Sequence, residues 1–180
     1  MRTVSQTARG GRIIIVILLT LSLALSFATS VQAQAKKADA DAEFLTKVVP
    51  SIAASVKIID YAVTNSSDEK VRDFATRVLK QHKGSVEIAS EHAKRLNIAV
   101  VTDPDKDSKE MIDKLSKLKG TELDVAFLEW LSHIHHDTTV FDNEVKNGTD
   151  PDLITYAKNS IAAGNEHLKE AQELLAKLKN

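Results

Sequence analysis

The amino-acid sequence predicts an all-α protein, a four-helix bundle with a short extra helix in its middle connection. Apolar residues recur at helical spacing over four segments of more than about twenty residues each. The 180 residues include only 6 Gly and 3 Pro, and alternating apolar runs bounded by turn residues are absent. This composition argues against a β-sandwich or barrel, and the length suits one domain with a sizeable core.

Residues 1–33 have the order of a secretory signal peptide. Basic residues precede the uncharged apolar run 13–27, and small side chains follow at 31–33 and 33–35, where signal peptidase would cleave. The alternative is a retained membrane anchor, because the apolar character continues to Val31 and could just span a bilayer.

Of these two alternatives we expect cleavage, so that the mature chain begins at Gln34 or Lys36. Residues 34–42 are small and charged, which indicates a flexible leader, and the four-helix-bundle domain then covers 43–180. Cleavage removes three of the 24 basic residues and none of the 25 acidic ones, leaving a net charge of about −4. The charges are interspersed, so we expect no nucleic-acid partner. The absence of Cys excludes disulfides and thiolate metal sites.

The first two long helices are predicted from their apolar stripes and from the polar turn between them. The first begins near Phe44 and ends at the turn 65–67. The second begins with a capping-box pattern, Ser66 followed by Glu69, and runs to about Asn97. Because the connection is short, these two helices should be antiparallel neighbours.

A short amphipathic helix is predicted over 111–118, followed by two more long helices. Thr121 and Asp124 offer a cap for the third, which should run unbroken to Gly148. The sequence 150–151, Asp-Pro, opens the fourth. The inner stripe of the fourth helix is predicted to be Ile154, Ala157, Ile161, Leu168 and Leu175. The longer middle connection permits a crossover, and a plain up-down arrangement is equally compatible.

The six histidines are the only lead toward chemistry. His82 falls on the apolar stripe of the second helix, where both ring nitrogens need hydrogen-bond partners or a metal ion. The more common outcome is a core histidine bonded to a polar neighbour such as Ser55 or Tyr61. We favour that interpretation, with His82 facing inward.

Three histidines lie within the stretch 131–136, but they cannot all bind one ion inside the bundle. Ile134 marks the centre of the buried face, so His133 and His135 flank it on opposite sides and His136 points outward. His136 should therefore be exposed.

Two sets of metal ligands remain open. His82, His135 and His167 could converge between helices, although His167 is expected to flank its stripe rather than centre on it. The alternative set is a surface site for zinc or copper, built from Glu129, His133 and His136. A third possibility is that the surface set is only a solvated polar face.

No assembled catalytic motif is present. Glu-x-x-His occurs nowhere in the chain, so the usual carboxylate-histidine set of ferritin-like di-iron proteins is missing. There is also no Gly-x-Ser-x-Gly elbow, no His-Glu-x-x-His, no phosphate-binding Gly loop and no Cys nucleophile. We therefore expect a protein that works by binding rather than by catalysis.

Three stretches resemble a bacterial family called domain of unknown function 4142, described as predicted outer-membrane proteins with a ferritin-like bundle. They are VRDFATRVLKQH (71–82), LKGTELDVAFLEWLSHIHH (118–136) and HLKEAQEL (167–174). The resemblance covers roughly 43–178. It implies a ferritin-like fold and a location in the cell envelope, in the periplasm or associated with the outer membrane.

Several positions match the pattern of this family, and two depart from it. The matching positions are Phe74, Ala75, His82, His135 or His136, and His167-Leu168. A first-helix Glu typical of the family falls near Ser55, and its Phe-Asp pair is Leu123-Asp124 here. The resemblance therefore does not imply a complete carboxylate-rich metal site.

The leading hypothesis is an exported, non-enzymatic helical-bundle protein of the cell envelope with a binding or stress-related role and no required cofactor. The rival is a ferritin-like metal-binding protein that holds a divalent transition metal through His82, His135 and His167. A third hypothesis is a structural or self-associating envelope component. The sequence names no partner and no oligomeric state.

Overall fold

The computed structural model describes residues 40–104 and 106–179, and every regular element in that part of the chain is helical. The predicted signal peptide and most of the predicted leader lie outside the described residues. The first described helix covers residues 40–65, so the leader prediction is wrong for 40–42, which are helical. The reason is burial, because Ala40 and Asp41 are 7% and 5% exposed. The Asp41 carboxylate also accepts hydrogen bonds from the backbone N–H and the hydroxyl of Thr149.

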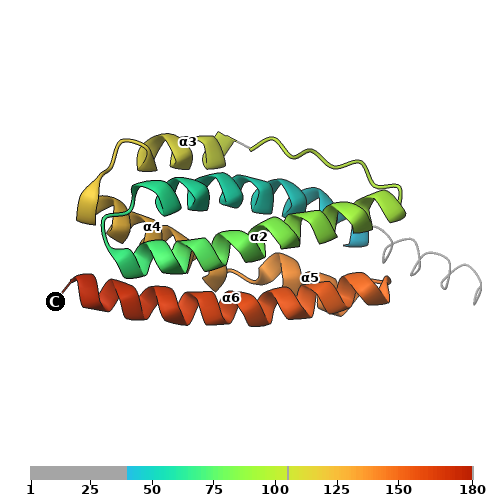
Figure 1. The fold of residues 1–180 in the computed structure, drawn as a ribbon. Helices are drawn as coiled ribbons and strands as arrows, with labels where there is room; N and C mark the ends of the chain where they lie inside the picture. The colour runs from blue at the N-terminus through green and yellow to red at the C-terminus, as the bar shows by residue number, and fades with distance from the viewer. Residues whose placement is uncertain (1–39, 105, 180) are drawn as a thin grey trace, which may run out of the picture. The chain divides into compact units, whose positions relative to one another are not determined.

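Five further helices follow along the chain. They are α2 (Glu69–Arg95), α3 (Lys106–Leu115), α4 (Gly120–His136), α5 (Thr139–Asn147) and α6 (Pro151–Leu178). Figure 1 shows that helix 40–65 and α2 run antiparallel, as do the α4–α5 pair and α6. The connection through α3 returns to the end of the bundle where α2 began, so α2 and the α4–α5 pair run in the same direction. The predicted four-helix bundle is confirmed, and the middle connection is a crossover.

The third long helix is not continuous as predicted, since it breaks at 137–138 into α4 and α5. The Asp137 carboxylate accepts from Thr139 N–H at 3.0 Å, and the Thr138 hydroxyl donates to Asp142 at 2.7 Å. Side chains of these types offer the backbone alternatives to helical hydrogen bonds. The short helix α3 also starts five residues before its predicted start at 111, because its first turns carry charged residues that an apolar pattern does not detect.

Two predicted caps are wrong. The N-cap of α2 is Asp68, whose carboxylate accepts from the N–H groups of Lys70 and Val71, rather than the pair Ser66 and Glu69. Asp124 does not cap its own helix. It is fully buried and accepts from Ser67 N–H at 3.0 Å, from the Ser67 hydroxyl at 2.6 Å and from Asp68 N–H at 2.9 Å. Asp124 therefore joins α4 to the start of α2.

The core consists of two apolar clusters. One is centred on Phe74 and Phe127 and includes Leu79 on α2 and Ala171 on α6. The other surrounds Phe44 and includes Ala89 on α2 and Ala157 on α6. Along both helices, the residues between these clusters include histidines, at position 82 in α2 and at position 167 in α6. A polar site thus lies between two halves of the core.

The buried face of α6 is rotated by about one residue from the predicted stripe. Its buried residues are Leu153, Tyr156, Ala157, Gly164, His167, Ala171 and Leu174. Ile154 and Ile161 are only half-buried. The prediction that His167 flanks its stripe is therefore wrong, since this side chain lies on the inner face.

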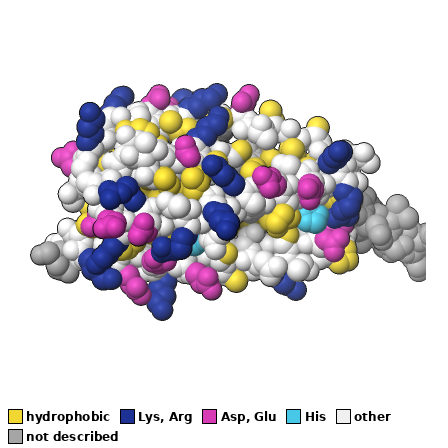
Figure 2. Space-filling model, in the orientation of Figure 1, with side chains coloured by type: hydrophobic (Ala, Val, Ile, Leu, Met, Phe, Trp, Pro, Cys, Tyr) yellow, Lys and Arg dark blue, Asp and Glu magenta, His cyan; other side chains and the backbone are white. Residues whose placement is uncertain are grey.

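Charged groups join helix ends and cover the outside. The Arg95 guanidinium, at the end of α2, donates to both carboxylate oxygens of Asp150, each at 2.7 Å, and Asp150 is the N-cap of α6. On the face shown in Figure 2, basic and acidic side chains are interspersed, as the sequence predicts. Among the described residues, no helix is long and apolar enough to cross a membrane.

The buried residue of α5 is a carboxylic acid, Glu144. Glu144 is 0% exposed, and an added Cβ at Gly148 would come within 2.2 Å of Glu144 Oε1, so the carboxyl group packs directly on the glycine. Burial, which is the largest cause, and the neighbouring carboxylates of Asp41 and Asp150 together raise the pKa of Glu144 to about 8. Nothing in the sequence around Glu144 predicts its burial, because the segment is polar and Asp41 lies far away along the chain.

Candidate metal centre

His82 lies on the inner face of α2 and is 9% exposed, as predicted. Its Nδ1 atom is 2.7 Å from the hydroxyl oxygen of Ser55, on helix 40–65. That hydroxyl donates its own proton to the carbonyl oxygen of Ile52 at 2.8 Å. With its proton on the Ile52 carbonyl, the Ser55 oxygen accepts from His82, and this arrangement assigns the ring proton to Nδ1. The Nε2 atom keeps a free lone pair.

His167 reaches the same space from α6 and is 8% exposed. Its Nε2 atom is hydrogen-bonded to the side-chain oxygen of Gln81, the residue before His82. Because an amide oxygen can only accept, the proton of His167 lies on Nε2. The lone pair of His167 is then on Nδ1.

His135 comes from the last turn of α4 and is half-buried. Its Nε2 atom is 3.2 Å from Nδ1 of His167, and the proton of this bond belongs to His135 because His167 Nδ1 has none. The ring can approach α6 because residue 164 is glycine. A Cβ there would lie 3.0 Å from His135 Nδ1.

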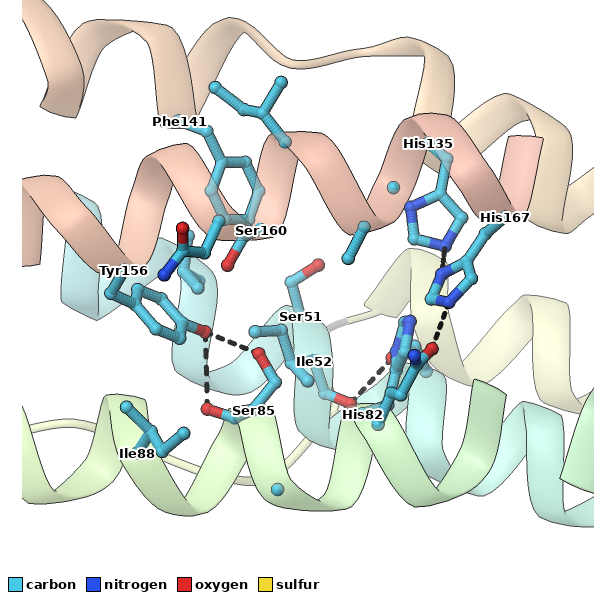
Figure 3. Close-up of a pocket in the computed structure, with 18 of the residues that line it drawn as sticks. Ser51, Ile52, His82, Ser85, Ile88, His135, Phe141, Tyr156, Ser160 and His167 are labelled. Atoms are coloured by element: carbon cyan, nitrogen blue, oxygen red, sulfur yellow. Dashed lines mark hydrogen bonds between the residues drawn. The ribbon is translucent and has the colours of Figure 1, made fainter. Parts of the chain in front are cut away.

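The three imidazoles form one cluster between the helices (Figure 3). One nitrogen from each of His82, His135 and His167 lies within 4.8 Å of the other two. The separation of 3.2 Å between His135 and His167 is close to the value of about 3.3 Å for two nitrogens that bind one tetrahedral ion at about 2.0–2.1 Å. The arrangement thus fits a single metal ion after small side-chain shifts.

Burial keeps these rings neutral. Desolvation, together with the neighbouring His135 and His167, lowers the pKa of His82 to about 3. Desolvation and His167 likewise lower the pKa of His135 to about 4. The pKa of His167 is also lowered by desolvation. Neutral imidazole is the form that binds metal, so at neutral pH no proton has to be removed from an imidazolium.

The ligand atoms of the alternative surface set, Glu129, His133 and His136, do not converge on one point. Glu129, His133 and His136 are exposed, the last as predicted, and the Glu129 carboxylate pairs with Lys179 at 2.9 Å. Among the described residues, His82, His135 and His167 are the one set of three His, Cys, Asp or Glu side chains whose ligand atoms converge. That set contains no carboxylate, as expected from the missing Glu-x-x-His motif.

A cavity of about 850 Å³ adjoins the cluster, and all three histidines line it. Figure 3 shows the imidazoles at one end and Tyr156 with Ser85 farther along. The Tyr156 hydroxyl and the Ser85 hydroxyl are 2.7 Å apart. The cavity lies between α2 and α6, with helix 40–65 and the α4–α5 break forming the rest of its wall.

Three contributors to this site were not identified from the sequence. Gln81 contacts His167, and Gly164 makes room for His135. Neither residue belongs to a sequence motif that predicts a metal site. The third is the break at 137–138, whose two residues line the cavity, and the apolar stripe of the third helix did not predict it. The predicted contact of His82 with Ser55 is confirmed.

Comparison with known proteins agrees with this architecture. A family model described as Domain of unknown function (DUF4142) matches residues 26–174. No curated protein matches the chain. The crystal structure of a DUF305 protein from Streptomyces coelicolor, described as predicted to be secreted, is similar with a TM-score of 0.66 and 18% identity. The match covers 78% of this chain and 94% of that one, and at this identity it shows the fold alone. Because the family model spans most of the sequence, the chain belongs to the DUF4142 family.

Proposed function

We propose that this protein is an exported metal-binding protein that holds one divalent transition-metal ion through His82, His135 and His167. The observation that carries the proposal is the convergence of three imidazole nitrogens, from three different helices, within 4.8 Å of one another. These side chains are 53 and 32 residues apart in sequence. Burying three imidazoles together costs hydration energy that each ring would keep at the surface, so their convergence suggests a bound ligand.

The hydrogen bonds around the cluster also support a metal role. Ser55 and Gln81 accept the ring protons of His82 and His167 and so direct the other nitrogen of each ring inward. Metal-binding histidines typically donate their second N–H to an oxygen in this way. To coordinate an ion through Nε2, His135 would carry its ring proton on Nδ1 instead, so binding by three neutral imidazoles should release no net proton at neutral pH.

The donor set favours zinc or copper. Imidazole nitrogen suits Zn²⁺, Cu²⁺ and Ni²⁺, whereas Mg²⁺ and Ca²⁺ need oxygen ligands. With three protein ligands, a tetrahedral ion would keep a fourth position for a solvent molecule or another ligand, and all three histidines line the cavity. Export is supported by the signal-peptide pattern of residues 1–33.

The test is metal titration of the untagged mature protein after treatment with a chelator. Calorimetry with Zn²⁺ and with Cu²⁺ should give one ion per chain. Thermal unfolding should shift upward, because an ion that binds only the folded state at about 100 times its Kd adds about 2.7 kcal/mol. Less than a tenth of an ion per chain would refute the proposal.

Two substitutions locate the ion. His82→Leu should abolish the metal-dependent rise in melting temperature, after an intrinsic loss of about 1–3 kcal/mol from the unpaired Ser55. His136→Ala should leave the metal response unchanged, because this side chain is exposed. The opposite pattern would move the site to the surface set of Glu129, His133 and His136.

A further inference from the structure

The cavity beside the histidines has the dimensions of a small-molecule site. Its volume of about 850 Å³ lies within the range of about 300–1,000 Å³ that is typical of ligand pockets. It is also elongated. His167 and Tyr156 both line it, and they are eleven residues apart on α6, about 16 Å along the helix axis.

The surface that lines the cavity is mainly apolar, although several hydroxyl and amide side chains also reach it. Its large apolar side chains are Val48, Ile52, Ile88, Ile134, Phe141 and Ile161. Ile88 is 47% exposed and is one of only two large hydrophobic side chains that are exposed in the described part of the chain. An apolar molecule in the cavity would cover Ile88 and so remove this unfavourable contact with water.

The cavity supplies no buried negative charge to balance a metal ion. Three neutral imidazoles leave a bound dication with its full charge, and a charge in such surroundings needs a counter-charge. Asp137 and Asp152 are the carboxylates among the described lining residues, and both are exposed. Asp137 is held by Thr139, and Asp152 lies 3.9 Å from the Arg95 guanidinium. The counter-charge at the ion must therefore come from outside the protein.

We propose that this cavity binds a small organic monocarboxylate with an apolar body. Its carboxylate occupies the open position on the metal ion held by His82, His135 and His167, and its body lies along Ile52, Ile88 and Phe141. The hydrogen-bonded pair of Tyr156 and Ser85 lies along the cavity between the histidines and Ile88. This inference rests on the proposed metal site and adds the class of its ligand.

The test uses octanoate as the probe, with calorimetry on the mature protein before and after loading with one equivalent of Zn²⁺. Loading should tighten octanoate binding at least tenfold. Acetate, which has the same head and almost no body, should bind at least a hundredfold more weakly than octanoate. 1-Octanol, which has the body without the charge, should show no gain from zinc.

A matched pair of substitutions on α6 tests the location. Ser160→Trp places a large ring in the cavity and should abolish octanoate binding while one zinc ion still binds. Lys158→Trp puts the same ring on the exposed side of the helix, outside the cavity, and should change neither. Equal loss in both variants would overturn the location.

Failure of this inference can be separated from failure of the metal proposal because zinc stoichiometry is measured first. One zinc ion per chain with no zinc-dependent gain for octanoate would overturn the ligand class alone. If no zinc or copper binds, the proposed function itself is refuted, and the ligand inference falls with it.

Discussion

The Ser55 hydroxyl lies 2.7 Å from Nδ1 of His82, and both side chains are buried between helix 40–65 and α2. Because the Ser55 proton is already donated to Ile52, this contact fixes which nitrogen of His82 is protonated. The buried hydroxyl of Ser55 thus holds the His82 ring in one orientation.

Removing this hydroxyl should weaken metal binding without removing a ligand. We expect Ser55→Ala to lower zinc affinity by about 10–100-fold, the usual effect of losing a group that orients a metal-binding histidine. Calorimetry measures the change. Ser51→Ala, one turn earlier on the same helix and also lining the cavity, is the control and should bind zinc as the wild type does. Equal affinity in the Ser55→Ala protein would show that His82 needs no orienting partner.

The two glycines that line the cavity should respond differently to substitution by alanine. An added Cβ at Gly84 meets nothing within 4 Å, so Gly84→Ala should stabilise α2 by up to about 1 kcal/mol and leave zinc affinity unchanged. At Gly164 the same Cβ lies 3.0 Å from His135 Nδ1. Gly164→Ala should therefore displace the His135 ring and weaken zinc binding. Urea unfolding and zinc titration of both variants measure the difference, and identical zinc affinities would contradict the close approach of His135 to α6.

The metal-free protein should lose stability in mild acid. The folded-state pKa values of His82 and His135, about 3 and about 4, lie below the unfolded value of 6.5. Below pH 6.5 the unfolded chain takes up protons that the folded protein does not, so stability falls from pH 6.5 down toward pH 4. Between pH 6.5 and 5, His82 alone contributes up to about 2 kcal/mol to this loss.

Denaturant unfolding at pH 7, 6 and 5 measures the acid slope. His82→Leu should have a shallower slope than the wild type, whereas His136→Ala, which removes an exposed ring, should keep the wild-type slope. If His82→Leu loses as much stability as the wild type over this range, His82 is not buried in its neutral form.

Glu144 should produce the opposite pH dependence. Its folded-state pKa of about 8 lies above the value of 4.5 for the free group, so the folded protein binds the extra proton between these limits. Stability should therefore fall as pH rises from about 4.5 to 8, because ionisation of a buried carboxyl group beside Asp41 and Asp150 is unfavourable. Glu144→Gln should flatten this slope and raise stability at pH 8.

The control for this prediction is Glu173→Gln on α6, where the carboxylate is exposed. It should leave the slope between pH 6 and 8 as in the wild type. If Glu144→Gln is less stable than the wild type at pH 8, the Glu144 carboxylate is ionised in the folded protein and is stabilised there.

The sequence by itself determined the helices and the inward direction of His82. Apolar spacing of about 3.6 residues records which face of each helix leaves water, and that information is local. It also determined that His136 is exposed, since a residue about 160° from the centre of a stripe cannot share its burial. The partner Ser55 was foreseeable because it is polar and lies on an otherwise apolar stripe.

Only the tertiary structure decided how the chain passes from α2 to α4, where the third helix breaks and how α6 is rotated. These features depend on contacts between distant residues, such as the hydrogen bonds of Asp124 to Ser67 and Asp68. The rotation of α6 by one residue placed His167 on the inner face, and Gly164 let His135 reach it. The spacing of apolar residues cannot predict that the histidines converge. It indicates which face of each helix is buried, but not how the helices are aligned with one another along the bundle.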